Sequence, residues 1–237
     1  MIAPDPSNSL ELLRTEAGLT VHDVMDGGHD NKGLHDLQGL LVKHFPDHAH
    51  VVGELDDAWL NGSPDPEVLI HGWLLTNVSG PVGFLVFHTN LRRGVMLQHY
   101  VAMEQSAREG LPFGWLRHLF DAMLEAGEAE ASARGVDLVG AMGENSPHHV
   151  VGWRRIGYRV LDVDYREPYH GKHWADFGEP TFFDMTPMLK LTQHGAGLPL
   201  GEAAVAAASA YLIDHYLLDA NNATVAHTLR LAAALTY

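Results

Sequence analysis

The chain contains no cysteine. It can therefore form neither a disulfide nor a thiolate metal site, and it has no cysteine nucleophile. Basic residues are also scarce, with 15 lysines and arginines against 30 acidic residues and a formal net charge of -15. Such a field repels the phosphates of nucleic acids and of anionic membranes, so neither is expected as a partner.

Long apolar runs are missing as well. No uninterrupted stretch approaches the ~18 residues that span a bilayer, and the first residues lack a basic segment followed by an apolar one. We therefore expect a cytoplasmic protein. The GxSxG and GxxxxGK[ST] motifs are absent too, which leaves serine hydrolase and phosphate-loop NTPase chemistry without support.

What is present is an ordinary globular composition with an uneven charge. The 237 residues are 46% apolar, which suits one large domain or one domain with an appendage. Residues 1–66 hold 12 acids against 3 bases, whereas nine of the eleven arginines lie between Arg92 and Arg166. The first region could suit a cation and the second an anion, although scattered surface charge explains the pattern equally well.

The hydrophobic pattern predicts a mixed α/β domain. Strands are expected at 19–26, 67–77, 83–90, 95–104, 136–142, 158–167 and 181–191, and helices at 30–45, 54–60, 112–134, 149–155, 202–218 and 222–235. Asp30 is the expected cap of the first helix. Hairpin-length connections favour a mostly antiparallel sheet, and the helix at 112–134 predicts a central β-α-β crossover. The expected domains are 1–194 and a helical C-terminal extension, 195–237.

One junction carries most of the functional information. In YVAMEQSAREGLPFGWLRHLF (100–120) a strand leads through a glycine-containing turn into a long amphipathic helix. Free backbone N–H groups and the positive end of a helix dipole make an anion site there, and glycine allows close backbone approach. This junction and the order of elements resemble the GNAT superfamily of acyl-CoA-dependent N-acyltransferases over about residues 19–191.

The resemblance implies a set of cofactor-binding residues. Those that it assigns to acetyl-CoA are Ala102, Met103, Arg108, Gly110, Phe113 and Gly114, with Arg108 and the glycines at the pyrophosphate. The family places its glycines two residues apart, whereas here they are four apart.

A second junction, ENSPHHVVGWRRIGYRVLDVDY (144–165), is similar to a later segment of the family. It implies that Asn145 or Ser146 lies near the pantetheine arm. Many members also carry a tyrosine five residues before the aromatic at Tyr158, as general acid for the departing thiolate, and this chain has Trp153 there. The proton then comes from Tyr158, from Tyr100 or from water, or the chemistry is slow.

The activity that the resemblance implies is transfer of an acetyl group from acetyl-CoA to a primary amine. Glu104 and Glu144, each at the end of a predicted strand, are the candidate general bases, and Glu104 is slightly favoured. Solvated strand-end carboxylates are the ordinary alternative for both. Backbone N–H groups at 102–104 are expected to polarise the thioester carbonyl.

The acid-rich first region predicts that the acceptor is a cationic small molecule, and Glu54, Asp56 and Asp57 are the suspected cluster. The alternative is a non-catalytic GNAT-like module that binds an acyl-CoA or a protein partner. A homodimer is compatible with the sequence.

Seventeen histidines raise the question of a metal. The close pairs are His48 with His50, His148 with His149, and His170 with His173, but none makes a recognised ligand signature. No metal site is expected. His71 or His99 could act as a base, although strand histidines are more often packed and hydrogen-bonded.

Overall fold

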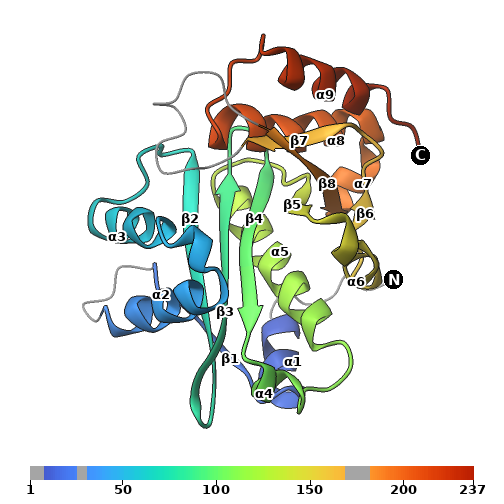
Figure 1. The fold of residues 1–237 in the computed structure, drawn as a ribbon. Coiled ribbons are helices and arrows are strands. Elements are labelled where there is room, and N and C mark those ends of the chain that lie inside the picture. Colours follow the sequence, from blue (N-terminus) through green and yellow to red (C-terminus); the bar gives the residue numbers. More distant parts are fainter. Residues whose placement is uncertain (1–7, 26–30, 169–181) are drawn as a thin grey trace. The chain divides into compact units, whose positions relative to one another are not determined.

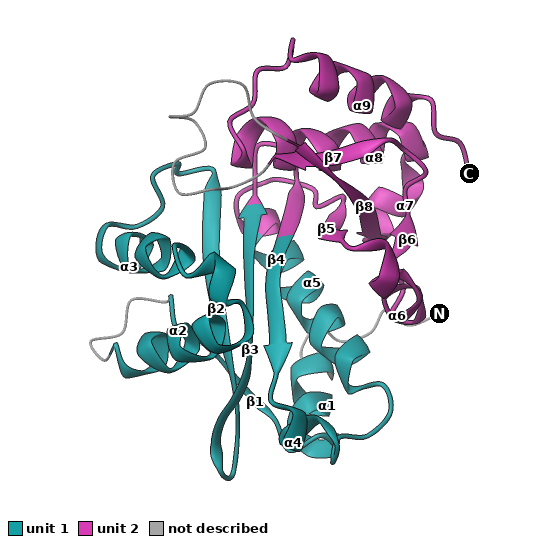
Figure 2. Cartoon of the chain, in the orientation of Figure 1, with its two compact units in different colours: residues 1–89, 98–130 teal, residues 90–97, 131–237 magenta. Residues whose placement is uncertain are grey.

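The computed structural model describes residues 8–25, 31–168 and 182–237 (Figure 1). The chain divides into two compact units, which are coloured in Figure 2. Unit 1 comprises residues 1–89 and 98–130, and unit 2 comprises residues 90–97 and 131–237. Asp30, the expected helix cap, and the pair His170 and His173 lie outside the described residues.

The elements found mostly in unit 1 are α1 (Asn8–Glu16), β1 (Thr20–Asp23), α2 (Lys32–His44), the 3-10 turn η1 (Pro46–His48), α3 (Val51–Asn61), β2 (Val68–Asn77), β3 (Gly80–Asn90), β4 (Val95–Met103), α4 (Gln105–Arg108) and α5 (Trp115–Ala133). Those of unit 2 are β5 (Gly140–Asn145), the 3-10 turn η2 (Pro147–His149), α6 (Val150–Arg155), β6 (Arg159–Val160), β7 (Tyr165–Pro168), β8 (Phe182–Leu191), α7 (Gln193–Gly197), α8 (Leu200–Ser209), the π-helical turn η4 (Ala210–His215) and α9 (Ala223–Ala233). The first three residues of β4 and the last three of α5 belong to unit 2.

Unit 1 is a sheet with helices on both faces. Its strand order is β1-β2-β3-β4, and β1 pairs antiparallel with β2 from Thr20 opposite Thr76. Phe84 and Val86 of β3 pack against the apolar faces of α2 and α3. Phe87 points to the other face, since side chains alternate along a strand, and there it stacks on His71 beside α5. The expected run of three strands after residue 66 is confirmed.

The long helix begins later than the sequence predicts. It starts at Trp115 rather than Pro112, because Gly114 has φ of +99°, which no helix accommodates. It ends as predicted before Gly135, whose φ of +72° is the left-handed cap conformation. The short helices α1, α4 and α7 were not predicted.

Unit 2 contains the strand order β4-β5-β8-β6, with β7 also pairing with β8. The prediction of one strand over 158–167 is wrong. Val160 pairs with Met188 and Tyr165 pairs with Met185, so five steps along this segment match three along β8. The two surplus residues cannot stay in register, and the segment divides into β6 and β7.

The fifth strand also lies later than expected, at 140–145 rather than 136–142. Residues 136–139 form no regular strand, although the Val139 N–H donates to the Gly94 carbonyl at 2.7 Å.

The alanine-rich tail packs inside unit 2. Side chains of α8, η4 and α9 share one buried core with β5 and β8, so the boundary expected near residue 195 falls within this unit. As a domain division it stays a prediction. No helix in the described part of the chain is both long and apolar enough to cross a bilayer.

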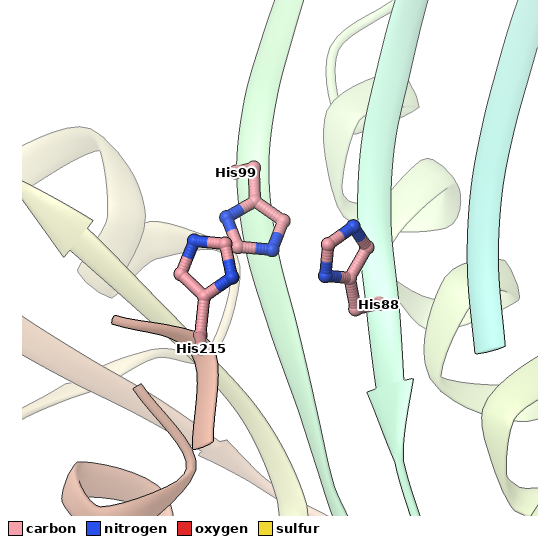
Figure 3. A group of neighbouring side chains, drawn as sticks. All are labelled: His88, His99 and His215. Atoms are coloured by element: carbon pink, nitrogen blue, oxygen red, sulfur yellow. The ribbon is translucent and has the colours of Figure 1, made fainter. Parts of the chain in front are cut away.

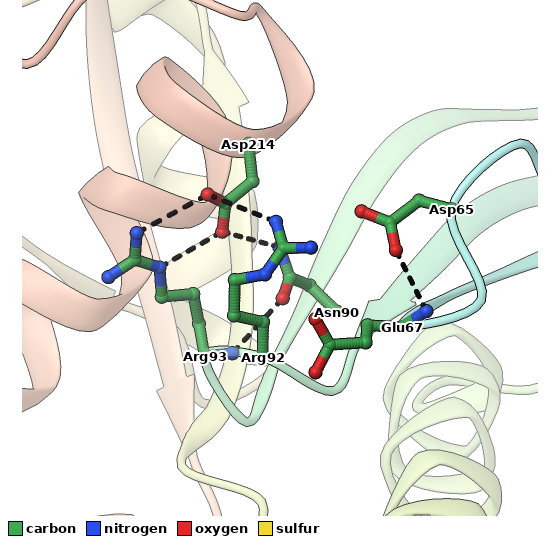
Figure 4. A network of polar contacts seen from close by, with 6 residues as sticks. All are labelled: Asp65, Glu67, Asn90, Arg92, Arg93 and Asp214. Atoms are coloured by element: carbon green, nitrogen blue, oxygen red, sulfur yellow. Dashed lines mark hydrogen bonds and ion pairs between the residues drawn. The ribbon is translucent and has the colours of Figure 1, made fainter.

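A buried ion pair fixes η4 in this unit (Figure 4). The Asp214 carboxylate accepts hydrogen bonds from Nε of Arg93 and Nδ2 of Asn90, both at 2.9 Å, and Arg92 lies 3.7 Å away. Only 5% of the Asp214 side chain is exposed. Its removal would leave buried donors without an acceptor, which is costly.

Candidate functional site

The junction of β4, α4 and α5 lies in unit 1. A Cβ on Gly83 of β3 would come within 2.7 Å of the Ala102 carbonyl oxygen, so glycine is needed where β3 meets the end of β4. This close approach holds the backbone of Ala102 and Met103. The Glu104 N–H donates to the Val82 carbonyl at 2.8 Å and is therefore already used. The expected polarising role stays a prediction for Ala102 and Met103.

The turn before α5 presents unpaired backbone donors. Within the described chain, the N–H groups of Phe113, Gly114, Leu116 and Arg117 donate to no backbone carbonyl. The positive φ of Gly114 turns the chain into the first turn of a 19-residue helix. The arrangement is a ready anion site. The Phe113 side chain beside it is fully exposed.

Two of the predicted cofactor residues lie just before this turn. Arg108 ends α4 and is exposed, and no acidic residue among those described forms an ion pair with it. Gly110 does not have a positive φ, and the nearest atom to a Cβ built on it is 3.9 Å away. Neither the backbone nor packing within unit 1 therefore requires glycine at 110.

Glu104 is held by two basic side chains of α2. Its Oε1 accepts a hydrogen bond from Nζ of Lys43 at 2.6 Å, and Nε2 of His44 lies 3.5 Å away. The hydrogen bond from Lys43 is the main cause that lowers the pKa of this carboxyl below its ordinary value. A carboxylate stabilised in its charged form is a weaker base, so the geometry does not favour Glu104 as the proton acceptor. Its catalytic role stays a prediction.

A histidine-tyrosine pair in unit 1 was not predicted as a unit. Nδ1 of His48, in η1, lies 3.1 Å from the hydroxyl of Tyr100 on β4. Phe45 packs edge-on against both rings. Burial, followed by the positive charge of His50, lowers the pKa of His48 below 6.5. The two residues are 52 positions apart, so no local pattern signals the contact.

His71 is a structural cation rather than a base. Its Nδ1 lies 2.7 Å from Asp23 and its Nε2 3.1 Å from Glu130. Burial alone would lower its pKa, but the hydrogen bond with Asp23 and the close contact with the Glu130 carboxylate raise the pKa to about 9. The imidazole is therefore protonated near neutrality and joins β1, β2 and α5.

His99 lies beside a second strand histidine. His88 on β3 and His99 on β4 are neighbours (Figure 3). Their ring centroids are 4.3 Å apart. Burial lowers the pKa of His88 to about 3, and the charge of His71 contributes. His88 is consequently neutral.

Glu144 belongs to a buried network in unit 2. Its two carboxylate oxygens accept hydrogen bonds from the hydroxyls of Tyr165 and Tyr216, the latter at 2.5 Å. Burial is the main cause that raises the pKa of Glu144 well above its ordinary value, and the nearby charge of Glu167 adds to it. Burial likewise raises the pKa of Glu167 to about 7. Perturbed carboxyl groups of this kind mark functional-site candidates, and the role of Glu144 as base stays a prediction.

Asn145 ends β5 with an unused donor. Its Nδ2 is inaccessible to solvent, and no described group accepts a hydrogen bond from it. Buried amide donors are rarely left unpaired, so this atom suits a ligand carbonyl. Ser146 follows and begins η2 without a side-chain capping bond.

Tyr158 is buried behind α6. Its ring packs edge-on against Trp153, with centroids 5.3 Å apart, and 3% of the residue is exposed. Trp153 therefore has a packing role, as the ordinary interpretation holds. Nearby, Nζ of buried Lys190 donates to the Ile156 carbonyl at the end of α6, at 3.0 Å. The expected role of Tyr158 as general acid stays a prediction.

The sequence matches no protein-family model and no curated protein. Among solved structures, a chimera of spermidine N-acetyltransferase from Vibrio cholerae and hSSAT matches with a TM-score of 0.50 at 10% identity, covering 76% of this chain and 99% of the other. The chain has the fold of the GNAT superfamily. The fold predicted from the sequence is thereby confirmed.

Two further acetyltransferases match less well. A Bacillus subtilis acetyltransferase in complex with CoA is 17% identical, with 73% of this chain and 99% of the other covered and a TM-score of 0.43. The aminoglycoside 6'-acetyltransferase type Ii is 13% identical, with 73% and 96% covered and a TM-score of 0.44.

In this GNAT fold the suspected acidic cluster lies on α3. Asp56 is engaged by the buried Gln38, whose Nε2 donates to it at 2.7 Å. Partial burial raises the pKa of Glu54, and the charge of His50 opposes this. Asp57 is exposed. The three acids therefore lie in different surroundings, and their role toward an amine stays a prediction.

Proposed function

We propose that the chain is an N-acetyltransferase, which transfers an acetyl group from acetyl-CoA to a primary amine of a cationic small molecule. The observation that carries the proposal is the anion site at the start of α5. Four backbone N–H groups of this turn donate to no backbone carbonyl in the described chain, and the exposed Arg108 at the end of α4 precedes the turn by a few residues and forms no ion pair with a described acid. The pyrophosphate of CoA is an anion that suits this donor set.

The second junction, in unit 2, offers a polar donor of its own. The unused Nδ2 of Asn145 could donate to an amide carbonyl of the pantetheine arm, at the end of β5. Acetyl-CoA would supply an activated thioester carbonyl. The N–H groups of Ala102 and Met103 would stabilise the charge that develops on that carbonyl oxygen.

Calorimetry with CoA tests the anion site. Arg108→Ala should cost about 1.5 to 3 kcal/mol of binding free energy, because a charge-assisted contact is lost. Gly114→Val should weaken binding too, because a β-branched residue disfavours a φ of +99° and closes the approach to the backbone. Arg134→Ala is the matched control, since Arg134 is an exposed arginine beyond the other end of α5.

Gly110→Ala tests whether a side chain at this turn crowds the ligand, without the backbone strain that a substitution at Gly114 introduces. Gly110 has no positive φ and room for a Cβ, so the substitution should leave the fold unchanged. A fall in CoA affinity in this variant would therefore report direct crowding of the phosphates. Unchanged affinity in both Arg108→Ala and Gly114→Val would refute the assignment of the anion site.

A non-catalytic GNAT-like module is the second candidate. Its support is the engagement of Glu104 by Lys43 and of Glu144 by two tyrosines, together with Trp153 at the position of the family's acid. Release of free CoA thiol from acetyl-CoA, measured against a panel of amines, separates the two. The module would bind acetyl-CoA without amine-dependent thiol release.

A further inference from the structure

The pair of His48 and Tyr100 has the geometry of a proton relay. The 3.1 Å separation of Nδ1 and the hydroxyl oxygen is a hydrogen bond, and the two ring centroids are 5.3 Å apart. Phe45 fixes both rings from one side. Both residues are half-buried, so the pair remains accessible to water.

The surroundings keep the imidazole neutral. The groups that face it are His50 and Asp47 on its own segment and Tyr100 on β4, and only Asp47 favours the charged form. Burial and His50 outweigh Asp47, so the pKa of His48 stays below 6.5. A neutral imidazole can accept a hydrogen bond, and with Tyr100 as donor the accepting atom is Nδ1.

The pair continues into a row of rings within unit 1. The ring centroids of His50 and His48 are 6.0 Å apart. On β4, the ring centroids of His99 and Tyr100 are 6.4 Å apart. His88 follows at 4.3 Å from His99 (Figure 3). On α3, the carboxyl group of Glu54 interacts electrostatically with His50.

Glu104 is a poor alternative base. The hydrogen bond from Lys43 lowers the pKa of Glu104, so its carboxylate holds a proton weakly. An amine acceptor arrives as an ammonium ion at neutral pH and must lose a proton before it can attack. The chemistry needs another proton acceptor, and the pair of His48 and Tyr100 in unit 1 supplies a candidate.

We propose, on the basis of the proposed acetyl transfer, that Tyr100 is a catalytic residue that takes a proton from the acceptor ammonium while its own hydroxyl proton passes to Nδ1 of His48. The ammonium becomes a free amine and His48 becomes an imidazolium. The amine nitrogen then attacks the thioester carbonyl, the C–N bond forms and the C–S bond breaks. The second nitrogen proton goes to the thiolate, and His48 releases its proton to water before the next turnover.

The pH profile of kcat/KM tests this route. For the unmodified chain, activity should fall on the acid side with an inflection below pH 6.5, because protonated His48 accepts no proton. Tyr100→Phe and His48→Gln should each lower kcat/KM by roughly 100-fold or more and remove this inflection. Tyr100→Phe keeps the ring that packs against Phe45, so acetyl-CoA affinity by calorimetry should be unchanged.

Two further variants serve as a diagnostic and a control. His50→Gln should move the inflection to higher pH, because it removes a positive charge that lowers the pKa of His48. His35→Gln, an exposed histidine on α2, should leave the profile unchanged. NMR titration of the His48 ring should show the same changes in its pKa: a rise in His50→Gln and no change in His35→Gln. This measurement does not depend on turnover.

The outcomes separate this inference from the function on which it rests. No amine-dependent turnover by the unmodified chain contradicts the proposed acetyl transfer. Turnover with an acid-side inflection that survives both Tyr100→Phe and His48→Gln contradicts only the relay.

Discussion

Buried side chains in unit 2 have unusual proton affinities because their charged forms lack water. Glu144 and Glu167 share the hydroxyl of Tyr216 as a neighbour, and burial is the main cause of the raised pKa of each carboxyl. Burial also raises the pKa of Tyr165 and Tyr216 well above their ordinary value, so both hydroxyls remain donors. Burial therefore favours the protonated forms of these groups.

Glu167→Gln should therefore stabilise the protein at high pH. The folded pKa of Glu167, about 7, exceeds the ordinary 4.5, so folded chains bind this proton more tightly than unfolded ones. The contribution to stability is fully present below pH 4.5 and is lost as the pH rises through about 7. We expect the variant to have a Tm at least ~2 °C higher at pH 8 and a similar Tm at pH 4.5, measured by thermal unfolding.

Asp184→Asn is the control for this change. Asp184 lies on the neighbouring strand β8 with 84% of its side chain exposed, and it pairs with Arg166 at 3.3 Å. The same loss of charge should there produce no gain that depends on pH. A Tm difference for Glu167→Gln that is equal at both pH values would contradict the explanation.

Among elements, the ion-paired His71 links two strands and a helix. Its folded pKa of about 9 exceeds the ordinary 6.5, so its contribution is fully present below pH 6.5 and is lost as the pH rises through about 9. Each pKa unit corresponds to about 1.4 kcal/mol, so we expect a loss of roughly 3 kcal/mol in the free energy of unfolding between pH 6 and pH 9.5. Urea unfolding at the two pH values measures it.

His71→Gln should be less stable than the unmodified chain at pH 6 and should lose this dependence on alkaline pH. His22→Gln provides the comparison, because His22 is exposed on the adjacent strand β1. It should keep the full slope. If His71→Gln kept the same loss of unfolding free energy between pH 6 and pH 9.5, the loss would come from another group.

Element positions could be predicted where local chemistry decides them. The apolar stripe of α5 and its stop at Gly135 are visible in the sequence, and so are the strands around Trp73, Phe84 and Leu97. The division between β6 and β7 could not be predicted, because it depends on the register of both strands against β8, a later segment of the chain.

The candidate site divides in the same way. Gly114 and Arg108 are close in sequence and could be singled out. Two contacts of the site join segments more than 50 residues apart: His48 with Tyr100, and Lys43 with Glu104. Only the tertiary structure brings these residues together.

At the scale of the whole molecule, the net charge of -15 bears on the choice of substrate. An acidic protein attracts cations over about 8 Å at physiological ionic strength, and added salt screens this attraction. We expect cationic amines such as polyamines to be better acceptors than neutral ones. Their KM should rise between low and high salt, while the KM of acetyl-CoA changes little, as steady-state kinetics would show.

A neutral amine of similar size is the matched substrate for that experiment, since its KM should not respond to salt. A panel in which neutral or acidic acceptors outperform cationic ones would refute the predicted acceptor class.

The strand β4 contributes to both units, so the two units are completed at different times during translation. Unit 1 is fully translated once residue 130 is added, whereas unit 2 then consists of residues 90–97 alone. Adding residues 131–237 takes roughly 5 to 20 s at 5 to 20 residues per second. During those seconds the first residues of β4 await their partner β5. An open strand edge invites pairing with other chains, so the nascent protein is most exposed to aggregation in this interval.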